Sequence, residues 1–439
     1  AIYISGSYGG NITAVLMNTP GTPDSLFMVF DGYPMTLRGE GARAIGITTI
    51  SAFVGGLVGA LALLLIAPPL ALIAIKFGPL EMFLATMMGI TIIIGLTKGA
   101  MLKGSLSACL GLLCALIGID SFTSMPRFTF GIVQIYEELP LLPTVLGLFA
   151  VSQVLLLVAE NRETIVLDKS SMRGSTFISF KDLMKMMVNM LRSSVIGTIV
   201  GIIPAAGTTV AAGISYNLAK RTDPNPDSFG HGNEQGLASV SAANNAVVGG
   251  SLVPLLTLSI PGNATSAIFL GGLLIHGLSP GTQLFTVHAK TIYGMLFGMI
   301  IAQLYILIIG LFGGPLFVKV TGVPNSVLIP LIGCFSILGA YSFRYLIFDM
   351  FLVMFFGVVG YYMTKVNMPL APFVLTFVLG GNAELQLRRA FKLLRTNFWA
   401  VALKPLPLIL LAICLLFLIM PFWGDIKKFI TKKESVTIQ

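Results

Sequence analysis

Two clusters of small polar residues in this chain lie beside Pro-Gly pairs, inside stretches that are otherwise apolar. The first cluster surrounds Pro20-Gly21 and the second surrounds Pro261-Gly262. Proline removes a backbone donor and clashes with the preceding turn, and glycine adds backbone freedom, so each pair ends a helix. Free N–H groups at the start of a half-helix attract anions, and free carbonyl groups at the end of the preceding half suit Na⁺. The chemistry expected here is therefore the binding of a small anion, together with a cation.

Hydroxyl and amide side chains beside a break supply donors and acceptors without the cost of a buried charge. We predict that these side chains face a substrate or a coupling ion. The alternative is capping of the half-helix by Ser, Thr or Asn, and one cap donor can serve both purposes. The candidates at the first break are Asn18, Thr19, Pro20, Gly21, Thr22 and Ser25, and those at the second are Ser259, Pro261, Gly262, Asn263, Thr265 and Ser266.

Two further groups complete the predicted binding site. Asn244 and Asn245 lie in a run of small residues, where paired amides indicate either a ligand contact or hydrogen bonding between helices. The other group is a broken polar turn that contains Pro204, Gly207, Thr208 and Thr209.

Ionisable residues give weaker signals. Asp120 and Arg127 are close enough in sequence to favour a structural pair over an ion site, and so are Asp349 and Arg344. Lys365 is a candidate attractor for carboxylates. The four cysteines lie in apolar runs and the three histidines are scattered, so no metal site is predicted apart from Na⁺ at the broken-helix carbonyls.

The elements that must hold these residues are membrane helices. Of the 439 residues, 55% are hydrophobic and only 10% are charged, with a mean hydropathy of +0.91, whereas soluble domains carry about 25% charged residues. Apolar stretches of about 20 residues recur along the chain, which is the length that crosses a bilayer as a helix. They are continuous rather than alternating, which excludes a β-barrel. The predicted fold is an all-α integral membrane protein, a polytopic bundle of about 10–12 spans.

An internal repeat relates the two Pro-Gly stretches. Residues 8–25 are YGGNITAVLMNTPGTPDS and residues 248–266 are VGGSLVPLLTLSIPGNATS. Both contain Gly-Gly, an apolar stretch, Pro-Gly and a Ser/Thr/Asn cluster, in that order. Paired broken helices in two halves are the best sequence pointer to the binding site of a transporter. We therefore predict two pseudo-symmetric repeats with broken or re-entrant helices, inverted rather than parallel, and one site near the midplane where the breaks meet.

The polar stretches divide the chain. The predicted parts are a first transmembrane repeat (1–159), a polar connecting segment (160–188), a second transmembrane repeat (189–383), and a basic segment with a last hydrophobic segment and a Lys-rich tail (384–439). The net charge of +9 indicates positive cytoplasmic loops rather than nucleic-acid binding, because no basic stretch is interleaved with aromatic residues. The hydrophobic segment 403–422 has basic residues on both sides, so either it is re-entrant or one basic cluster is not cytoplasmic.

Motifs along nearly the whole chain resemble the large membrane subunit of tripartite tricarboxylate transporters, the TctA family. They occur in the family's order and are YGGNITAVLMNTPGTP with DGYPM (8–35), GIDSFTSMPRFTFG (118–131), GTIVGIIPAAGTTVAAGISY (197–216), AANNAVVGGSLVPLLTLSIPGNATSAI (242–268) and FGVVGYYMTKVNMPLAPFVLTFVLGGNAELQLRRA (356–390). The family has a further Gly-Pro segment before the first motif, so we expect additional residues ahead of Ala1. The chain departs from the family pattern at Ala205 and at Ser241-Ala242.

The resemblance implies a secondary transporter of the bacterial inner membrane that imports a small carboxylate by symport with Na⁺ or H⁺. The substrates would be tricarboxylates such as citrate, dicarboxylates or aromatic acids. It also implies two partners, which are a small four-helix membrane subunit and a periplasmic solute-binding protein that delivers the substrate. No cofactor other than the coupling ion is expected.

Two alternatives belong to other functional classes. A channel needs a continuous pore with a selectivity ring, whereas two unlike breaks suit a closed pocket better. A membrane-embedded enzyme needs a nucleophile and a base at membrane depth. The sequence contains no such pair, no Walker A motif and no metal-ligand motif.

Overall fold

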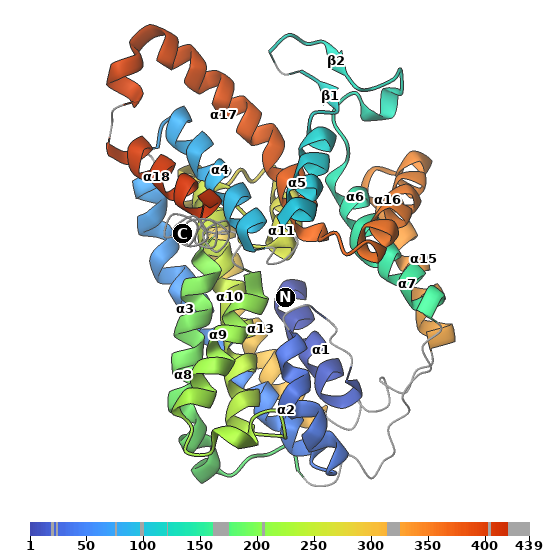
Figure 1. The fold of residues 1–439 in the computed structure, drawn as a ribbon, viewed down its shortest axis with the longest axis vertical. Helices are drawn as coiled ribbons and strands as arrows, with labels where there is room; N and C mark the ends of the chain where they lie inside the picture. Colours follow the sequence, from blue (N-terminus) through green and yellow to red (C-terminus); the bar gives the residue numbers. More distant parts are fainter. Residues whose placement is uncertain are drawn as a thin grey trace, which may run out of the picture. The chain divides into compact units, whose positions relative to one another are not determined.

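The computed structural model describes residues 1–18, 22, 25–74, 77–96, 101–120, 122–160, 175–203, 207–313, 325–402 and 405–419. These residues are almost entirely helical (Figure 1). The sheet within them consists of β1 (Gly118–Ile119) and β2 (Pro126–Arg127), which pair antiparallel. Seven helical segments in the described part are long and apolar enough to cross a membrane. The predicted all-α polytopic membrane fold is confirmed, while the number of spans stays a prediction.

The chain folds into two compact units, and each unit takes one segment from the first half of the sequence and one from the second. Unit 1 comprises Ala1–Ala74 and Leu157–Leu331, and unit 2 comprises Ile75–Leu156 and Ile332–Gln439. Each unit thus combines parts of both predicted repeats. The boundaries of the repeats, residues 1–159 and 189–383, remain untested.

Unit 1 contains the predicted site. Its elements are α1 (Ile2–Met17), α2 (Leu26–Leu37), α3 (Gly41–Ala74), α8 (Phe180–Ile202), α9 (Gly207–Thr222), η5 (Pro226–Ser228), α10 (Glu234–Leu258), α11 (Ala264–Ile275), α12 (Thr282–Thr286) and α13 (Ala289–Phe312).

Unit 2 contains the small sheet. Its other elements are α4 (Pro79–Leu96), α5 (Met101–Ala115), η2 (Val133–Ile135), α6 (Leu141–Leu146), the π-helical turn η3 (Gly147–Val151), α16 (Ile347–Lys365), α17 (Leu370–Ala402) and α18 (Pro405–Ile419), with α7 (Ser152–Glu160) and α15 (Asn325–Arg344) leading from one unit to the other.

Helix α10 is the core of unit 1, and its most apolar window is completely buried. Helices α3 and α8 lie beside it (Figure 1). Their glycines allow the close approach, because a Cβ atom at Gly55 would lie 2.0 Å from the Ala242 carbonyl oxygen and one at Gly197 would lie 2.3 Å from that of Ala243. Small residues at such contacts let membrane helices pack backbone against backbone. The composition of α10 therefore suits its central position.

Helix α1 runs antiparallel to α10. Tyr3, near the start of α1, bonds to Ser251 near the end of α10, whereas Asn11 further along α1 bonds to Asn244, which precedes Ser251. The two predicted broken helices thus lie side by side within unit 1 in opposite directions. This arrangement is the one expected of inverted repeats.

An ion network fixes the small hairpin of unit 2 to α17. Arg127 donates two hydrogen bonds to Glu384, at 2.7 and 3.0 Å, and Arg388 pairs with Asp120 at 3.1 Å. Arg388 also pairs with Glu384. The predicted direct pair of Asp120 with Arg127 is wrong, because α17 supplies a partner to each of them. The predicted pair of Arg344 with Asp349 is confirmed, with contacts of 2.5 and 3.0 Å.

Lys365, the predicted carboxylate attractor, lies over the ring of Tyr361 with its Nζ atom 5.1 Å from the ring centroid. Both residues belong to unit 2, outside the group of residues at the breaks. A cation–π contact thus accounts for part of its environment.

Hydrogen bonds to the Asp120 carboxylate make the attachment of the hairpin sensitive to acid. The hydroxyl of Thr123, the N–H of Phe122 and the guanidinium of Arg388 lower the pKa of Asp120 to about 2. A carboxyl group whose pKa is lower in the folded state contributes stability above its ordinary pKa, and that stability is lost as the pH falls through the lowered value. We expect pepsin to cleave the hairpin slowly between pH 4 and 3 and rapidly near pH 2, after normalisation to an unfolded substrate. Cleavage of Asp120→Asn should already be rapid at pH 4, and equal cleavage of the two proteins there would contradict this account.

Candidate functional site

At the first break, the chain turns back along α1. Asn18 ends α1 in the left-handed conformation, with φ of 55°. The hydroxyl of Ser25 donates to the Thr22 carbonyl at 2.7 Å and accepts from the Thr22 N–H at 3.2 Å. Thr22 lies against Gly10, where a Cβ atom would be 2.4 Å from the threonine Oγ1 atom. Thr19, Pro20 and Gly21 lie outside the described residues.

The second break has the same construction. Ser259 ends α10 in the left-handed conformation, with φ of 60°. The hydroxyl of Ser266 donates to the Asn263 carbonyl at 2.8 Å and accepts from the Asn263 N–H at 2.9 Å. Asn263 also caps α11, because its side-chain oxygen accepts from the Ser266 N–H at 2.8 Å. Gly262 lies against Ser251, where a Cβ atom would be 2.8 Å from the serine Cβ.

One offset of 241 residues relates every one of these positions. It pairs Asn18 with Ser259, Pro20 with Pro261, Thr22 with Asn263, Ser25 with Ser266 and Gly10 with Ser251. In each half, a residue near the break contacts the position that lies eight residues before the left-handed residue. The contacting residue is Thr22 in the first half and Gly262 in the second. The repeat in the sequence thus extends to backbone conformation and to individual hydrogen bonds.

Tyr3 joins the first half of the chain to the second break, and sequence reasoning missed it. Its hydroxyl lies 3.0 Å from Ser251 Oγ, and 3.0 and 2.7 Å from the amide oxygen and nitrogen of Asn263. The offset of 241 residues pairs Tyr3 with Asn244, which was predicted. Applying the offset to the predicted residues would therefore have found it.

A buried layer of amides lies between α1 and α10. The Asn244 side chain donates to the Asn11 side-chain oxygen at 3.2 Å, and that of Asn245 donates to the Ser241 carbonyl at 3.2 Å. The three asparagines are fully buried. Within the described part of the chain, Asn11 Nδ2 and Asn245 Oδ1 have no hydrogen-bond partner. Hydrogen bonding between helices accounts for Asn244, while ligand contact by this layer stays a prediction that the two unpartnered atoms support.

The third predicted group lies near the second break. Helix α8 ends at Ile202 and α9 begins at Gly207, with Pro204 outside the described residues. A Cβ atom at Gly262 would lie 3.0 Å from the Gly201 carbonyl oxygen, so the end of α8 contacts the second break. The side chains of Thr208 and Thr209 are half-buried.

At the site, the N-termini of the short helices α2 and α11 lie beside the antiparallel helices α1 and α10. Thr22 contacts Gly10 of α1 and Asn263 contacts Tyr3 of α1. The two α1 residues are seven positions apart, which corresponds to about 10 Å of helix. Helix starts of this kind favour anionic groups. Ser266 is buried beside them, whereas Thr265 is exposed.

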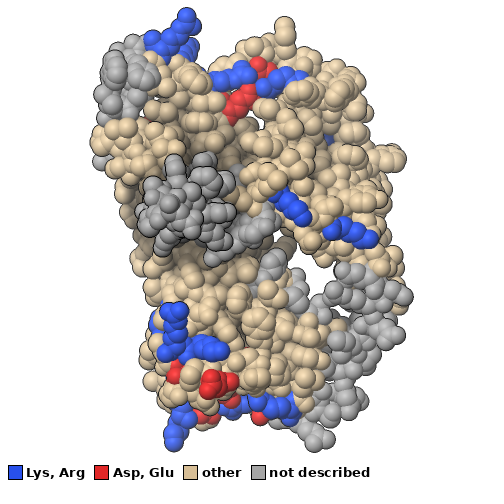
Figure 2. Space-filling view, viewed as in Figure 1, with Lys and Arg blue, Asp and Glu red and all other residues tan. Residues whose placement is uncertain are grey.

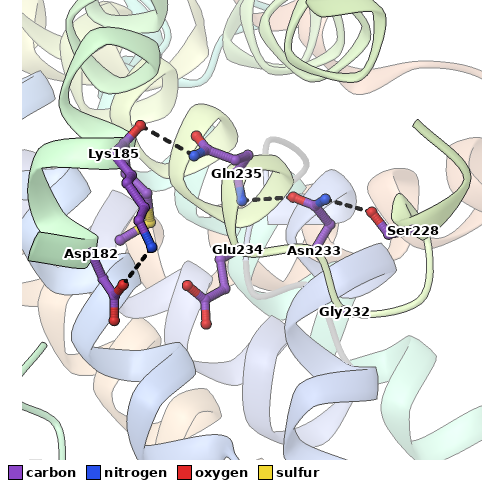
Figure 3. A pocket seen from close by; sticks show the side chains of 8 residues that line it. Asp182, Lys185, Ser228, Gly232, Asn233, Glu234 and Gln235 are labelled. Atoms are coloured by element: carbon purple, nitrogen blue, oxygen red, sulfur yellow. Dashed lines mark hydrogen bonds and ion pairs between the residues drawn. The ribbon is translucent and has the colours of Figure 1, made fainter. Parts of the chain in front are cut away.

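A cavity of about 320 Å³ lies elsewhere in unit 1, at the start of α10 (Figure 3). Its charged side chains are paired, since Lys185 contacts Asp182 at 3.2 Å and Arg43 bridges Asp182 and Glu234 at 3.1 and 2.5 Å. Gln235 donates to the Lys185 carbonyl. The cavity contains none of the predicted residues. Because its charges satisfy one another, it has no unpaired positive group to attract a carboxylate, and the breaks remain the better candidate.

Removal of one oxygen atom tests the role of Tyr3. Tyr3→Phe keeps the ring and the cap of α11 but removes the hydroxyl that holds the Asn263 amide. We expect kcat/KM for uptake to fall about fivefold to tenfold, since one hydrogen bond contributes about 1 kcal/mol. Tyr305→Phe is the control, because Tyr305 is 61% exposed on α13. Equal kinetics of the two variants would show that Tyr3 has only a packing role.

Comparison with known proteins identifies relatives of the chain. A family model described as the tripartite tricarboxylate transporter TctA family matches residues 1–375. An uncharacterized 52.8 kDa protein from the TAR-I ttuC' 3' region of Agrobacterium vitis is 32% identical over 438 residues, covering 100% of this chain and 86% of that protein. An uncharacterized protein from the TAR-II ttuC' 3' region of the same organism is 32% identical over 243 residues, covering 55% of this chain and 99% of that protein. No solved structure matches the chain.

Proposed function

Because the chain belongs to the tripartite tricarboxylate transporter TctA family, we propose that it imports a small carboxylate, with binding at the two matched breaks of unit 1. The observation that carries this proposal is the matched pattern of the breaks. Each has a left-handed residue at the end of a helix and a Ser hydroxyl bonded to the backbone of the residue three positions earlier, and a short helix, α2 or α11, follows. Two helix starts suit a substrate with carboxylate groups.

The side chains would act as neutral ligands. The hydroxyl of Thr22 and the amide of Asn11 have buried donor atoms without partners in the described residues. Thr22 lies at the first break, and Asn11 follows Gly10, against which Thr22 lies. At the second break, Tyr3 and Asn263 already hold each other in place. The substrate would thus bind preorganised side chains at the second break. Near the first break, it would accept hydrogen bonds from the donors of Thr22 and Asn11.

The coupling ion would be Na⁺ or H⁺. Carbonyl groups at the ends of α1 and α10 lose their helical partners at Asn18 and Ser259, and such carbonyls are the usual Na⁺ ligands of broken transporter helices. Transport would follow alternating access, with one part of the bundle moving around the site. The partners would be a small four-helix membrane subunit and a periplasmic solute-binding protein in the bacterial inner membrane.

Uptake into vesicles tests the proposal. The full chain is reconstituted with the small subunit, and radiolabelled citrate is supplied together with a periplasmic binding protein, with a Na⁺ gradient, a proton gradient or neither. We expect accumulation above the external concentration that needs one gradient and the binding protein. Flux that only equalises the concentrations would indicate a channel and would overturn the proposal. A panel of dicarboxylates and aromatic acids as competitors then defines the substrate.

A further inference from the structure

We propose that the hairpin of unit 2 and the charged half of α17 form an interfacial surface that binds anionic phospholipid headgroups. The interfacial surface is defined as residues 122–133 and 384–395. This inference does not depend on the proposed function, because none of these residues belongs to the predicted binding site.

The hairpin exposes apolar side chains that nothing within the described residues covers. Phe130 is 87% exposed, Val133 is 70%, Met125 is 68% and Phe128 is 55%. Four such side chains within nine residues form an apolar patch that a water-facing loop would not keep without a partner. Aromatic residues of this kind are enriched where membrane proteins meet the headgroup layer.

The ion network places the hairpin at the level where α17 leaves the apolar region. Residues 370–381 of α17 carry no charged side chain, and the first charged residue is Glu384. Glu384 holds Arg127, and Arg388 one turn later holds Asp120 and lies over the Phe122 ring, with Cζ 5.2 Å from the ring centroid. The hairpin is thus attached at the boundary between the apolar and charged parts of one helix, which is where headgroups would lie.

The charge of the surface selects anionic lipids. Arg127 and Arg388 neutralise the carboxylates of Asp120 and Glu384 within the network. Residues 389–402 add three basic residues and no acidic one. Arg389 and Arg395 are exposed, and exposed apolar Phe391 and Leu393 lie between them. Figure 2 shows basic side chains on this part of unit 2. Basic residues next to a membrane helix attract anionic headgroups, and the neighbouring apolar side chains can enter the layer beneath.

The depth of the hairpin can be measured with a fluorescent side chain. Phe130→Trp is made in the full chain with Trp399→Phe and Trp423→Phe, and the protein is reconstituted into vesicles of phosphatidylglycerol that carry bromine near the headgroup. We expect strong quenching of the tryptophan emission from position 130. The emission of a matched Arg221→Trp variant, whose substituted position is exposed in the last turn of α9 in unit 1, should be quenched little. Unquenched emission from position 130 would overturn the proposal, and so would quenching that disappears when the small membrane subunit is added, because that subunit would then be the occupant.

Charge removal tests the headgroup preference. The double variant Arg389→Gln with Arg395→Gln is compared with the variant Lys181→Gln with Arg221→Gln, which loses the same charge from exposed positions in unit 1. Native mass spectrometry of the detergent-solubilised proteins counts retained phosphatidylglycerol. We expect about tenfold weaker retention in the first variant and little change in the second. Equal retention by both variants, at unchanged melting temperatures, would overturn the proposal.

Discussion

Replacement of Gly262 by alanine is expected to lower carboxylate uptake at least tenfold while the protein still inserts and folds. The added Cβ atom would lie 2.8 Å from the Cβ atom of Ser251, 3.0 Å from its Cα atom and 3.0 Å from the Gly201 carbonyl oxygen. Two of these three atoms belong to the backbone, so rotation of a side chain cannot relieve the contact. The turn that leads into α11 must move instead, and a shift of about 1 Å in a positioned group is enough to lose function.

The cost of this substitution in stability should be smaller than its cost in transport. Overpacking at one position typically costs about 1–3 kcal/mol, which a large helical protein tolerates. The control is Gly272→Ala in α11, where an added Cβ atom would meet nothing within 4 Å. Radiolabelled uptake and the melting temperature in detergent are measured for both variants. Normal uptake by Gly262→Ala would refute the assignment of the second break to the binding site. The wider replacement of Pro261-Gly262 by Ala-Ala should abolish uptake entirely.

Replacement of Asp31 by alanine is expected to lower the free energy of unfolding by about 3 kcal/mol, more than either Asp31→Asn or Glu40→Gln. The Asp31 side chain is fully buried in α2, and its Oδ1 atom accepts three backbone N–H groups from the loop before α10. The donors are Gly230 at 2.8 Å, Gly232 at 2.9 Å and Asn233 at 2.8 Å. Gly230 and Gly232 have φ of 89° and 95°, a left-handed conformation that glycine adopts without strain. The loop thus directs its N–H groups at one carboxylate.

Alanine would leave these three donors without an acceptor, whereas Asp31→Asn keeps an oxygen atom but loses the charge. We therefore expect the melting temperature to fall most in the alanine variant and about half as much in the asparagine variant. The matched control is Glu40→Gln, which removes the exposed Arg38–Glu40 pair, whose side chains are 50% and 47% exposed. Exposed pairs contribute at most about 1 kcal/mol. A melting temperature of Asp31→Ala equal to that of the control would contradict the proposed clamp.

The sequence by itself determined the fold class and the candidate breaks. Apolar stretches of membrane length can be satisfied only by helices, so composition alone led to the all-α fold. Pro and Gly weaken a helix through local sterics, which need no tertiary contact, and helices indeed end at Asn18, Ile202 and Leu258 or within one residue of them. Other prolines lie inside helices, among them Pro34, Pro68 and Pro254, so the local rule marks candidate breaks and does not fix them. The pairing of Arg344 with Asp349 was also predictable, because the two residues are five positions apart.

The tertiary structure alone decided which distant residues meet. Asp120 pairs with Arg388 rather than with nearby Arg127, because α17 places a longer-range partner closer. Tyr3 reaches Asn263 only because α1 and α10 lie antiparallel, an arrangement that depends on how the helices pack and not on the local pattern of either one. The Pro-Gly breaks were visible as interruptions, but packing of two antiparallel helices is what makes them one candidate site. A local pattern reports only what neighbouring residues allow, and bringing together residues 260 positions apart requires the whole fold.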